Sequence, residues 1–416
     1  MLDKIVGIGL ILLAIALPFS IALSSLIFFP LLALWLFGGR WTLGRWRPVW
    51  GNTEKAYAVF LGISVLSSLL GLSQAHSFHE IYKKDFYFLI LVMVAAMAMQ
   101  QNVAERLVRW LLVAGFLSCV WGLTQFLVGV DQTDNSAGYL IYVPQEMSHW
   151  PRPIIDQFSM INGRVAGTYS HPLTYAESLL FLLAFALSFV SFEEGRRWLK
   201  WIPLTWLAGA ALLVSQSRGP WIAAVCVGLL LIVVRYRWGN LLRFAILILP
   251  LSSLFLMPSL RYRVHSIADI AHRSNQERLH MWQAGWQLWK GHPLLGIGPG
   301  NVKRVSVDFQ NEEEKKEGPW GHLHSTYVNF ATERGLFGLA AYGAFIAMLL
   351  YELVLGIQRS AGKDRAILWG CVGGILGFLV SGLTETTYNA SIISMMFYFV
   401  MGIGLALARR KESSCR

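Results

Sequence analysis

Long uninterrupted apolar blocks are the feature that most constrains what this chain can fold into. Blocks of about 18 or more apolar residues are typical of helices that cross a membrane, and such blocks recur along all 416 residues. Apolar residues make up 55% of the chain and charged residues only 14%, whereas about a quarter of the residues in a soluble domain are charged. We therefore expect an all-α polytopic membrane protein rather than a set of soluble domains.

The positions of these blocks predict about twelve transmembrane helices. The first block, 5–37, is too long for one helix, and Pro18 offers a break, so we expect a hairpin of two short spans. No cleavage pattern follows this block, so we expect it to be retained. The other spans are expected near 56–73, 86–100, 106–129, 173–192, 201–214, 220–234, 241–257, 326–357, 366–383 and 390–408. Residues 1–416 are thus predicted to form a single membrane bundle.

The net charge is +11, and the positions of the basic residues along the chain predict the orientation in the membrane. Cytoplasmic loops of membrane proteins are rich in lysine and arginine. If the N-terminus is cytoplasmic and the loops alternate, every short loop on that side is basic. The residues concerned are Lys4, Arg40, Arg45, Arg47, Lys55, Arg106, Arg109, Arg196, Arg197, Lys200, Arg235, Arg237, Arg243, Arg359, Lys363, Arg365, Arg409, Arg410, Lys411 and Arg416. Both termini are therefore predicted to be cytoplasmic, and we expect no nucleic-acid partner.

The opposite side of the membrane receives two long segments, 130–172 and 258–325, which we expect to form a partly helical cap. Within the second segment the sequence predicts a helix over 275–290, followed by a turn-rich stretch over 291–301. The polar residues that interrupt the apolar pattern fall almost wholly on this outer side. Candidate functional residues are therefore sought there.

Two motifs bring arginine to the outer ends of predicted spans. Arg218 lies in a tight turn, 215–220, where its guanidinium could bind phosphate oxygens in a planar fork. The ordinary alternative is an arginine that extends to the membrane interface. Arg164 and His171 add positive charge at the end of the first outer segment. Here the alternative is helix entry, with Ser170 as the cap and Pro172 in the first turn.

The predicted helix over 275–290 would place Arg278, Trp282, Trp286 and Trp289 on one face. Such a tryptophan stripe is typical of a membrane-interface belt. Arg278 could meet a second phosphate, or it could pair with Glu277 or a neighbouring acid. The glycines over 296–300 are not a dinucleotide fingerprint, because no strand precedes them, and we expect a close-packed turn.

A histidine pair lies where the second outer segment re-enters the membrane. His322 and His324 are too close in sequence to share a helical face, so they do not form the zinc motif of metalloproteases. No carboxylate cluster lies nearby, and Cys119, Cys226, Cys371 and Cys415 form neither a disulfide framework nor a metal motif. We therefore predict no metal and no cofactor. A histidine here suits a general base for a sugar hydroxyl, although either ring could simply bond to a neighbouring loop.

Taken together, these motifs resemble the O-antigen ligase/polymerase superfamily over about 160–340. The shared pattern is an arginine separated by three residues from a tryptophan, a proline-and-glycine turn, a histidine pair and a Glu-x-Gly-x-x-Gly helix. The matching residues are Arg278, Trp282, Pro293, Gly296, Gly298, Gly300, His322, His324, Glu333, Gly335 and Gly338. One departure is Ser325, where many members carry asparagine.

The resemblance implies a glycosyltransferase that moves a glycan from an undecaprenyl-diphosphate carrier at the periplasmic face of the inner membrane. For the ligases the acceptor is the lipid A–core oligosaccharide, and neither metal nor nucleotide sugar takes part. The resemblance assigns His324 as the catalytic base or as the residue that orients the acceptor, with Arg218 and Arg278 on the diphosphate. It also implies a set of supporting, substrate-binding residues, which comprises Arg164, His171, His322, Arg273 and Asn329.

Three alternatives to a ligase stay open. An O-antigen polymerase would use the same donor with a second carrier-linked glycan as acceptor, and a protein O-oligosaccharyltransferase would use a protein hydroxyl. The short outer cap favours the ligase. A transporter of lipid-linked glycan belongs to a different class and would favour charges in the middle of spans. The candidate acids Glu177, Glu352 and Glu385 lie near span ends, as the arginines do, which favours an enzyme.

Overall fold

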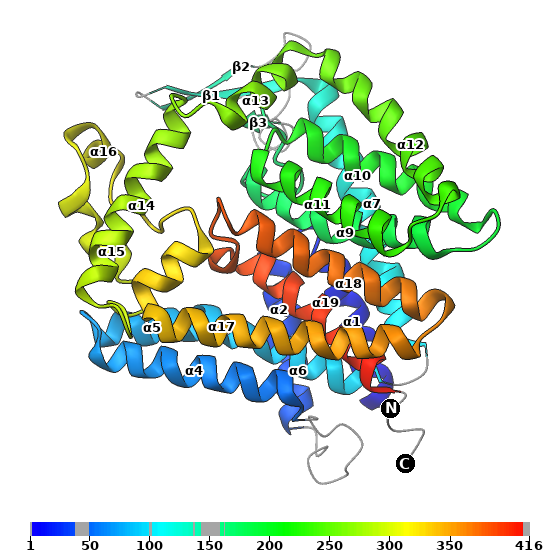
Figure 1. The fold of residues 1–416 in the computed structure, drawn as a ribbon, viewed down its shortest axis with the longest axis horizontal. Coiled ribbons are helices and arrows are strands. Elements are labelled where there is room, and N and C mark those ends of the chain that lie inside the picture. Colours follow the sequence, from blue (N-terminus) through cyan, green and yellow to red (C-terminus); the bar gives the residue numbers. More distant parts are fainter. Residues whose placement is uncertain are drawn as a thin grey trace. The chain divides into compact units, whose positions relative to one another are not determined.

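The computed structural model describes residues 2–37, 50–99, 102–135, 138–142, 159–161 and 163–410 (Figure 1). Several residues used in the sequence analysis lie outside this described part, namely Arg40, Arg45, Arg47, Lys411, Cys415 and Arg416. The chain divides into two compact units. The first comprises Met1–Gly38, Gln100–Ile267 and Ser360–Phe378, and the second comprises Gly39–Met99, Ala268–Arg359 and Leu379–Arg416.

The first unit is a helical bundle built around one buried helix, α9 (Pro172–Phe192). Pro172 begins α9 at a position where no backbone N–H is needed. Gly370 allows close packing on α9, because a Cβ atom there would lie 2.3 Å from Phe185. The other helices are α1 (Leu2–Ala16), α2 (Ile21–Phe37), α7 (Val103–Val128), α10 (Ile202–Val214), α11 (Arg218–Val234), α12 (Trp238–Ser252), α13 (Pro258–Ala268) and most of α18 (Gly362–Ser381).

A small sheet, which the sequence analysis did not predict, forms in the first long outer segment. It contains β1 (Val130–Asn135), β2 (Gly138–Tyr142) and β3 (Ser159–Ile161), in the order β2-β1-β3. β1 pairs antiparallel with β2 and parallel with β3. The described residues of this part of the predicted cap therefore include β-strands.

The second unit is built around α19 (Ser391–Arg410), which packs against α6 (Phe88–Met97) and α17 (Thr326–Arg359). Gly402 allows the first of these contacts, because a Cβ atom there would lie 2.7 Å from Cβ of Val94. α17 also runs along α4 (Asn52–Leu70), as Figure 1 shows. The remaining helices are α5 (Gln74–Lys84), α14 (Arg273–Gly291), α15 (Val302–Val305) and α16 (Glu312–Glu317). The helix predicted over 275–290 is confirmed as α14.

Seven helices within the described residues are long and apolar enough to cross a membrane. They are α4, α7, α9, α12 with its 3₁₀ extension to Leu256, α17, α18 and α19. The predicted N-terminal hairpin is present as α1 and α2, which are shorter apolar helices, as is α11. Two predicted spans, α6 and α10, have only 10 and 13 residues. The chain is thus an all-α multi-pass membrane protein, but the count of about twelve spans is not confirmed.

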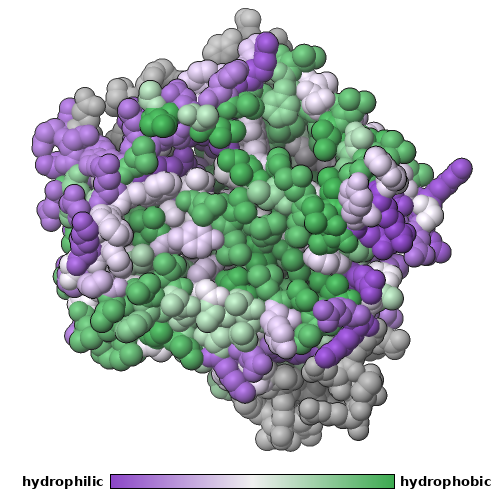
Figure 2. All heavy atoms as spheres, in the orientation of Figure 1, coloured by the Kyte–Doolittle hydropathy of each residue, from purple (hydrophilic) through white to green (hydrophobic). Residues whose placement is uncertain are grey.

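Large apolar side chains cover the outside of the membrane helices. Leu249 of α12 is 76% exposed, Val225 of α11 is 62% exposed and Val59 of α4 is 58% exposed. In the second unit, Figure 2 shows hydrophobic residues over α4 and hydrophilic residues over α16. Exposed apolar side chains of this kind are stable in a bilayer, where hydrocarbon surrounds them, and not in water.

A buried ionic cluster joins three helices at one end of the second unit. Arg409 of α19 donates two hydrogen bonds to the carboxylate of Glu54, both of 2.8 Å, and a third of 2.7 Å to Glu352 of α17. Glu54 also accepts the N–H of Gly51 and so caps α4. Thr53 donates to Glu352 at 2.8 Å. The cluster fixes the ends of α4, α17 and α19 to one another.

We expect the variant Arg409→Met to be markedly less stable than the wild type. The change leaves Glu54 and Glu352 buried without their cation, and breaking such a pair costs about 3–5 kcal/mol. Lys363→Met is the matched control, because its partner Glu105 and the lysine itself are both partly exposed and such a pair contributes about 0–1 kcal/mol. Thermal unfolding of the purified proteins in detergent measures both effects, and equal losses would contradict the assignment.

Candidate functional site

The start of α17 is fixed to the loop that joins α18 to α19. Ser325 caps the helix by accepting the N–H of Val328 at 3.4 Å. The N–H of Thr326 bonds to the carbonyls of Gly382 at 2.9 Å and Glu385 at 3.1 Å, and the Thr326 hydroxyl also donates to the Glu385 carbonyl. Residues near 324 and 385 are therefore held side by side, although the whole of α17 and α18 separates them in sequence.

Three side chains meet at this junction in the second unit. Nδ1 of His324 lies 3.0 Å from one carboxylate oxygen of Glu385, and the other oxygen accepts a hydrogen bond from Arg278 of α14. The Glu385 side chain is only 6% exposed, whereas that of His324 is 35% exposed. A buried carboxylate therefore bridges an arginine and a histidine, and the histidine is the most exposed of the three side chains, ahead of Arg278 at 20%.

The charge of Glu385 determines which nitrogen of His324 carries the proton. Burial opposes ionisation of this carboxyl, but the hydrogen bond with His324 and the charge of Arg278 hold its pKa below the ordinary value of 4.5. An ionised carboxylate only accepts hydrogen bonds, so Nδ1 of His324 must donate. In the neutral ring Nε2 then has a free lone pair and can accept a proton from a bound molecule.

His324 also has an unusual backbone conformation. Its φ of 45° lies in the left-handed region, which residues other than glycine rarely adopt. Such a conformation costs of order 1–3 kcal/mol and persists only where its surroundings fix it. Here the preceding Leu323 donates its N–H to Asn329 at 3.3 Å, and the following Ser325 caps α17. The loop is thus held in the conformation that directs the His324 ring toward Glu385.

The ring of His322 packs edge-on against His324, with 4.4 Å between the ring centroids. Burial and the neighbouring His324 lower the pKa of His322 to about 4, so this ring stays neutral near pH 7. Its buried Nδ1 has no hydrogen-bond partner among the described residues. The same holds for three further buried atoms close to the cluster, namely Nε of Arg278, Oγ1 of Thr384 and Oγ1 of Thr386. Polar atoms of this kind can bond to a ligand.

A break in α17 accommodates the glycine-rich turn that follows α14. At Gly335 the backbone leaves the helical conformation, with φ 68° and ψ −171°. The next two N–H groups, of Leu336 and Phe337, bond to the carbonyls of Pro293 and Leu294 at 2.9 and 3.1 Å. A Cβ atom on Gly335 would lie 2.2 Å from Leu294, so only glycine fits there. The close-packed turn predicted from the sequence is confirmed.

A buried ion pair holds the first part of α17 in the core of the second unit. Nη2 of Arg334 lies 3.3 Å from Asp85, and its Nε donates to Ser64 of α4 at 3.0 Å. Asp85 also accepts a hydrogen bond from Tyr388, which follows Glu385 in the same loop. The expectation that arginines lie only at span ends is therefore wrong for Arg334, which is buried within α17. This charge is paired and fixed in place.

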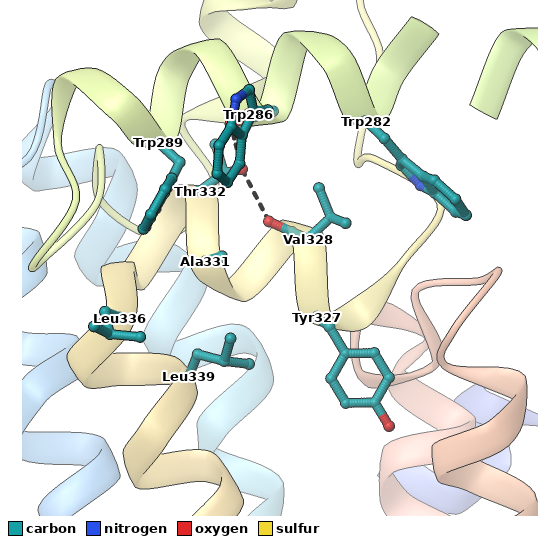
Figure 3. A pocket seen from close by; sticks show the side chains of 10 residues that line it. Trp282, Trp286, Trp289, Tyr327, Val328, Ala331, Thr332, Leu336 and Leu339 are labelled. Carbon is teal, nitrogen blue, oxygen red and sulfur yellow. Dashed lines mark hydrogen bonds between the residues drawn. The ribbon is translucent and has the colours of Figure 1, made fainter. Parts of the chain in front are cut away.

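An apolar groove runs between α14 and α17 and starts beside the cluster (Figure 3). Its volume is about 340 Å³, and it is lined by Trp282, Gly285, Trp286, Trp289, Tyr327, Val328, Ala331, Thr332, Leu336 and Leu339. Trp282 lies one helical turn after Arg278, and its indole N–H donates to the carbonyl of Leu323 at 3.0 Å. The predicted common face of the three tryptophans is thus confirmed, and it leads away from Arg278.

The predicted arginines of the first unit surround the turn between α10 and α11. Arg164 donates to the carbonyl of Ser215 at 3.2 Å and to the hydroxyl of Ser217 at 3.0 Å. Arg218, at the start of α11, donates to the carbonyl and hydroxyl of Ser266 at 2.6 and 3.2 Å. The two upstream motifs are therefore in contact with each other through Arg164 and this turn.

The other predicted binding residues have partners within the protein. His171, rather than the expected Ser170, caps α9, because its Nδ1 accepts the N–H of Leu173 at 3.2 Å. Arg273 pairs with Glu277 at 2.7 Å. The proposed alternative pair of Glu277 with Arg278 is therefore not formed. Asn329 is fully buried, and besides Leu323 it bonds to Glu333 at 2.9 Å.

The sequence analysis missed the role of Glu385 and treated it only as an acid near a span end. One signal was available. The predicted topology places the turn 384–389 on the same side of the membrane as His324. A lone carboxylate in that turn is expected to pair with a cation.

The fold and the cluster define a multi-pass helical membrane protein that holds an acid–base group beside an apolar groove. One comparison with known families bears on this class. Residues 203–343 match the family model described as O-antigen ligase. The matched stretch includes Arg218, Arg278, His322 and His324, but it ends before Glu385. A search of curated proteins found no match to the chain.

The lowered pKa of Glu385 predicts how the stability of the protein depends on pH. A carboxyl whose pKa is lowered by folding stabilises the native state above its ordinary pKa of 4.5, and this contribution disappears as the pH falls through the lower native value. We therefore expect Glu385→Gln to unfold at a lower temperature than the wild type near pH 7. The difference should shrink as the pH falls below about 4.5.

Thermal unfolding of both proteins across this pH range provides the measurement. Glu277→Gln is the control, because its pair with Arg273 is partly exposed and should change stability little. A deficit in Glu385→Gln that stays constant down to the lowest pH would show that the carboxylate charge is not what matters.

Proposed function

We propose that this protein is an O-antigen ligase that transfers a glycan from undecaprenyl diphosphate to the lipid A–core oligosaccharide, at the periplasmic face of the inner membrane. The observation that carries the proposal is the cluster of His324, Glu385 and Arg278, in which one buried carboxylate orients the histidine and pairs with the arginine. The O-antigen ligase match over 203–343 supports the same reaction class.

In the proposed reaction His324 acts as the general base. Its Nε2 takes the proton from a hydroxyl of the acceptor sugar while the hydroxyl oxygen forms a bond to the anomeric carbon of the glycan. The bond from that carbon to the diphosphate oxygen breaks, and its electron pair leaves with the diphosphate. Glu385 stabilises the imidazolium that forms, and general-base catalysis contributes typically about 10²–10⁴-fold in rate. Attack opposite the leaving group would invert the anomeric configuration.

Arg278 is proposed to stabilise the departing diphosphate. Positive charge aimed at developing negative charge is a strong source of transition-state stabilisation. Nε of Arg278 has no partner among the described residues, so the guanidinium can donate to a phosphate oxygen and still pair with Glu385. The resemblance to the family adds Arg218 as a second cation on the diphosphate, with Arg164, His171, Arg273 and His322 as supporting residues.

We also propose that the apolar groove receives the first isoprene units of the carrier. The groove is lined almost wholly by hydrocarbon and aromatic surface, which offers a sugar few hydrogen bonds but suits a polyprenyl chain. It begins one helical turn from Arg278, so a carrier whose diphosphate meets Arg278 has its first hydrocarbon units at the entrance. Polar and apolar parts of the donor would then follow successive turns of α14.

Transfer in a purified system tests the proposed reaction. Wild-type protein, carrier-linked glycan and lipid A–core are incubated with EDTA, and the products are separated on a gel. We expect glycan on lipid A–core, with the rate reduced about 10²-fold or more in His324→Ala and in Arg278→Ala. Arg218→Ala should also be strongly impaired. Longer carrier-linked glycan in place of this product would identify a polymerase.

Glu385→Gln tests the contribution of the Glu385 charge to the reaction in the same assay. We expect a large loss in kcat with little change in KM, because glutamine keeps the size of the side chain but loses the charge that stabilises the imidazolium. Glu312→Gln, at an exposed carboxylate that pairs with Lys315, is the control and should keep its rate. If no transfer occurs with a donor of verified activity, a transporter or a protein acceptor becomes the better explanation.

Filling the groove should weaken donor binding and leave the chemistry intact. Ala331 lines the groove, so Ala331→Phe is expected to raise KM for the carrier-linked donor by about tenfold, with kcat nearly unchanged. Ala340→Phe adds the same bulk at an exposed position on α17 outside the groove and should behave as the wild type. A donor whose diphosphate carries a methyl group in place of the prenyl chain lacks the units that the groove receives, so it should be less sensitive to Ala331→Phe. Equal sensitivity would refute the groove assignment.

A further inference from the structure

A second pocket, polar in character, lies in the first unit at the ends of α9, α11 and α12. Its volume is about 390 Å³, and it is lined by Ser191, Glu193, Glu194, Gly195, Arg235, Arg237, Gly239, Asn240 and Arg243. None of these residues belongs to the proposed transfer site. The sequence-based topology places their loops on the cytoplasmic side, whereas it places His324 and Arg278 on the outer side.

Asn240 is the residue that most needs a partner in this pocket. Its side chain lines the pocket and the residue is only 4% exposed, yet neither the oxygen nor the nitrogen of its amide has a hydrogen-bond partner among the described residues. A buried amide without partners is rare in native proteins, because each unpaired atom loses its bonds to water. A ligand that both accepts and donates hydrogen bonds would satisfy Asn240.

The electrostatics of the pocket favour an anion. Three arginines line it against two glutamates, Glu193 and Glu194. The carboxylate of Glu193 is already held by Lys200 at 3.0 Å and by the indole N–H of Trp201 at 3.2 Å. Neither Arg235 nor Arg237 forms an ion pair with a carboxylate among the described residues. Positive charge therefore exceeds negative charge in the pocket.

Arg243 and the start of α12 fix the geometry of this charge. One nitrogen of Arg243 donates to the carbonyls of Val190 and Glu193 at 2.6 and 3.1 Å, which anchors the guanidinium at the end of α9. α12 begins at Trp238, and no side chain caps its first N–H groups. The positive end of the helix dipole thus adds to the arginine charge.

We propose that this pocket binds a phosphate group, of the kind carried by an anionic phospholipid headgroup or by free phosphate. The arginines bind the phosphate oxygens, the Asn240 amide N–H₂ donates to one of them, and the amide oxygen accepts from a hydroxyl of the ligand. Both phosphatidylglycerol and monoprotonated phosphate supply such a hydroxyl. Trp238, which is 81% exposed beside the pocket, is typical of the membrane interface, where lipid headgroups lie.

Binding to the purified full-length protein tests the proposal. Mixed micelles with phosphatidylglycerol, mixed micelles with phosphatidylcholine, and inorganic phosphate are titrated separately, and native mass spectrometry and thermal unfolding report binding. We expect saturable stabilisation by phosphatidylglycerol and none by phosphatidylcholine. Equal stabilisation by inorganic phosphate would identify free phosphate as the source of the anion.

Two variants and one control make the test specific. The double variant Arg235→Gln/Arg237→Gln should weaken anion binding at least about tenfold. Asn240→Leu should weaken it similarly, but it should not lower, and can raise, the unfolding temperature of the ligand-free protein, because it removes the unpaired buried amide. Arg109→Gln removes a charge from another predicted cytoplasmic loop and should bind as the wild type.

Three outcomes would overturn the proposal. If no anion stabilises the wild type, or if the arginine double variant binds as tightly as the wild type, the pocket is not a phosphate site. Loss of binding in Arg109→Gln to the same extent would indicate a general effect of surface charge and would equally overturn the proposal. Should Asn240→Leu fail to fold, the arginine double variant decides the question alone.

Discussion

The buried pair of Arg334 and Asp85 is the constraint on which the architecture of the second unit depends. A charge in this position is tolerated only because its partners are fixed, and those partners come from α4, from the turn before α6 and, through Tyr388, from the loop before α19. Removing one partner would leave an uncompensated buried charge, so these elements are held in one arrangement. The same loop carries Glu385, so the fixed core also positions the carboxylate that orients His324.

The candidate site separates charge from hydrocarbon along a single helix. α14 presents Arg278 to the shared carboxylate and, one turn later, begins the tryptophan face of the groove. Glu385 couples Arg278 to His324, since a proton taken up by His324 also changes the field at Arg278. A donor with a diphosphate head and a polyprenyl tail has its polar and apolar parts in this same order. The arrangement therefore fits such a lipid-linked donor better than it fits a soluble nucleotide sugar.

Local features of the fold could be predicted from the sequence, and contacts between distant segments could not. Hydropathy located the apolar helices, and the glycine spacing predicted the close-packed turn that fills the break at Gly335. Span number was not confirmed, because α6 and α10 are shorter than their apolar blocks suggested. The contact of His324 with Glu385 joins residues 61 positions apart, and no periodicity encodes such a pair. Asn329 is another example, because a polar amide in this motif suggested a binding residue. It is fully buried and accepts the N–H of Leu323, so it helps to position the His324 loop.

Burial and hydrogen bonding distinguish the two histidines, which the sequence alone left equivalent. His322 is buried beside another imidazole, and its pKa of about 4 makes it too weak a base to hold a proton near pH 7. His324 is more accessible and has a carboxylate on Nδ1, so Nε2 of the neutral ring is the atom that can accept a proton. We therefore propose His324 as the residue that takes the proton. The neutral ring of His322, with its unpaired nitrogen, is suited to hydrogen bonding beside it.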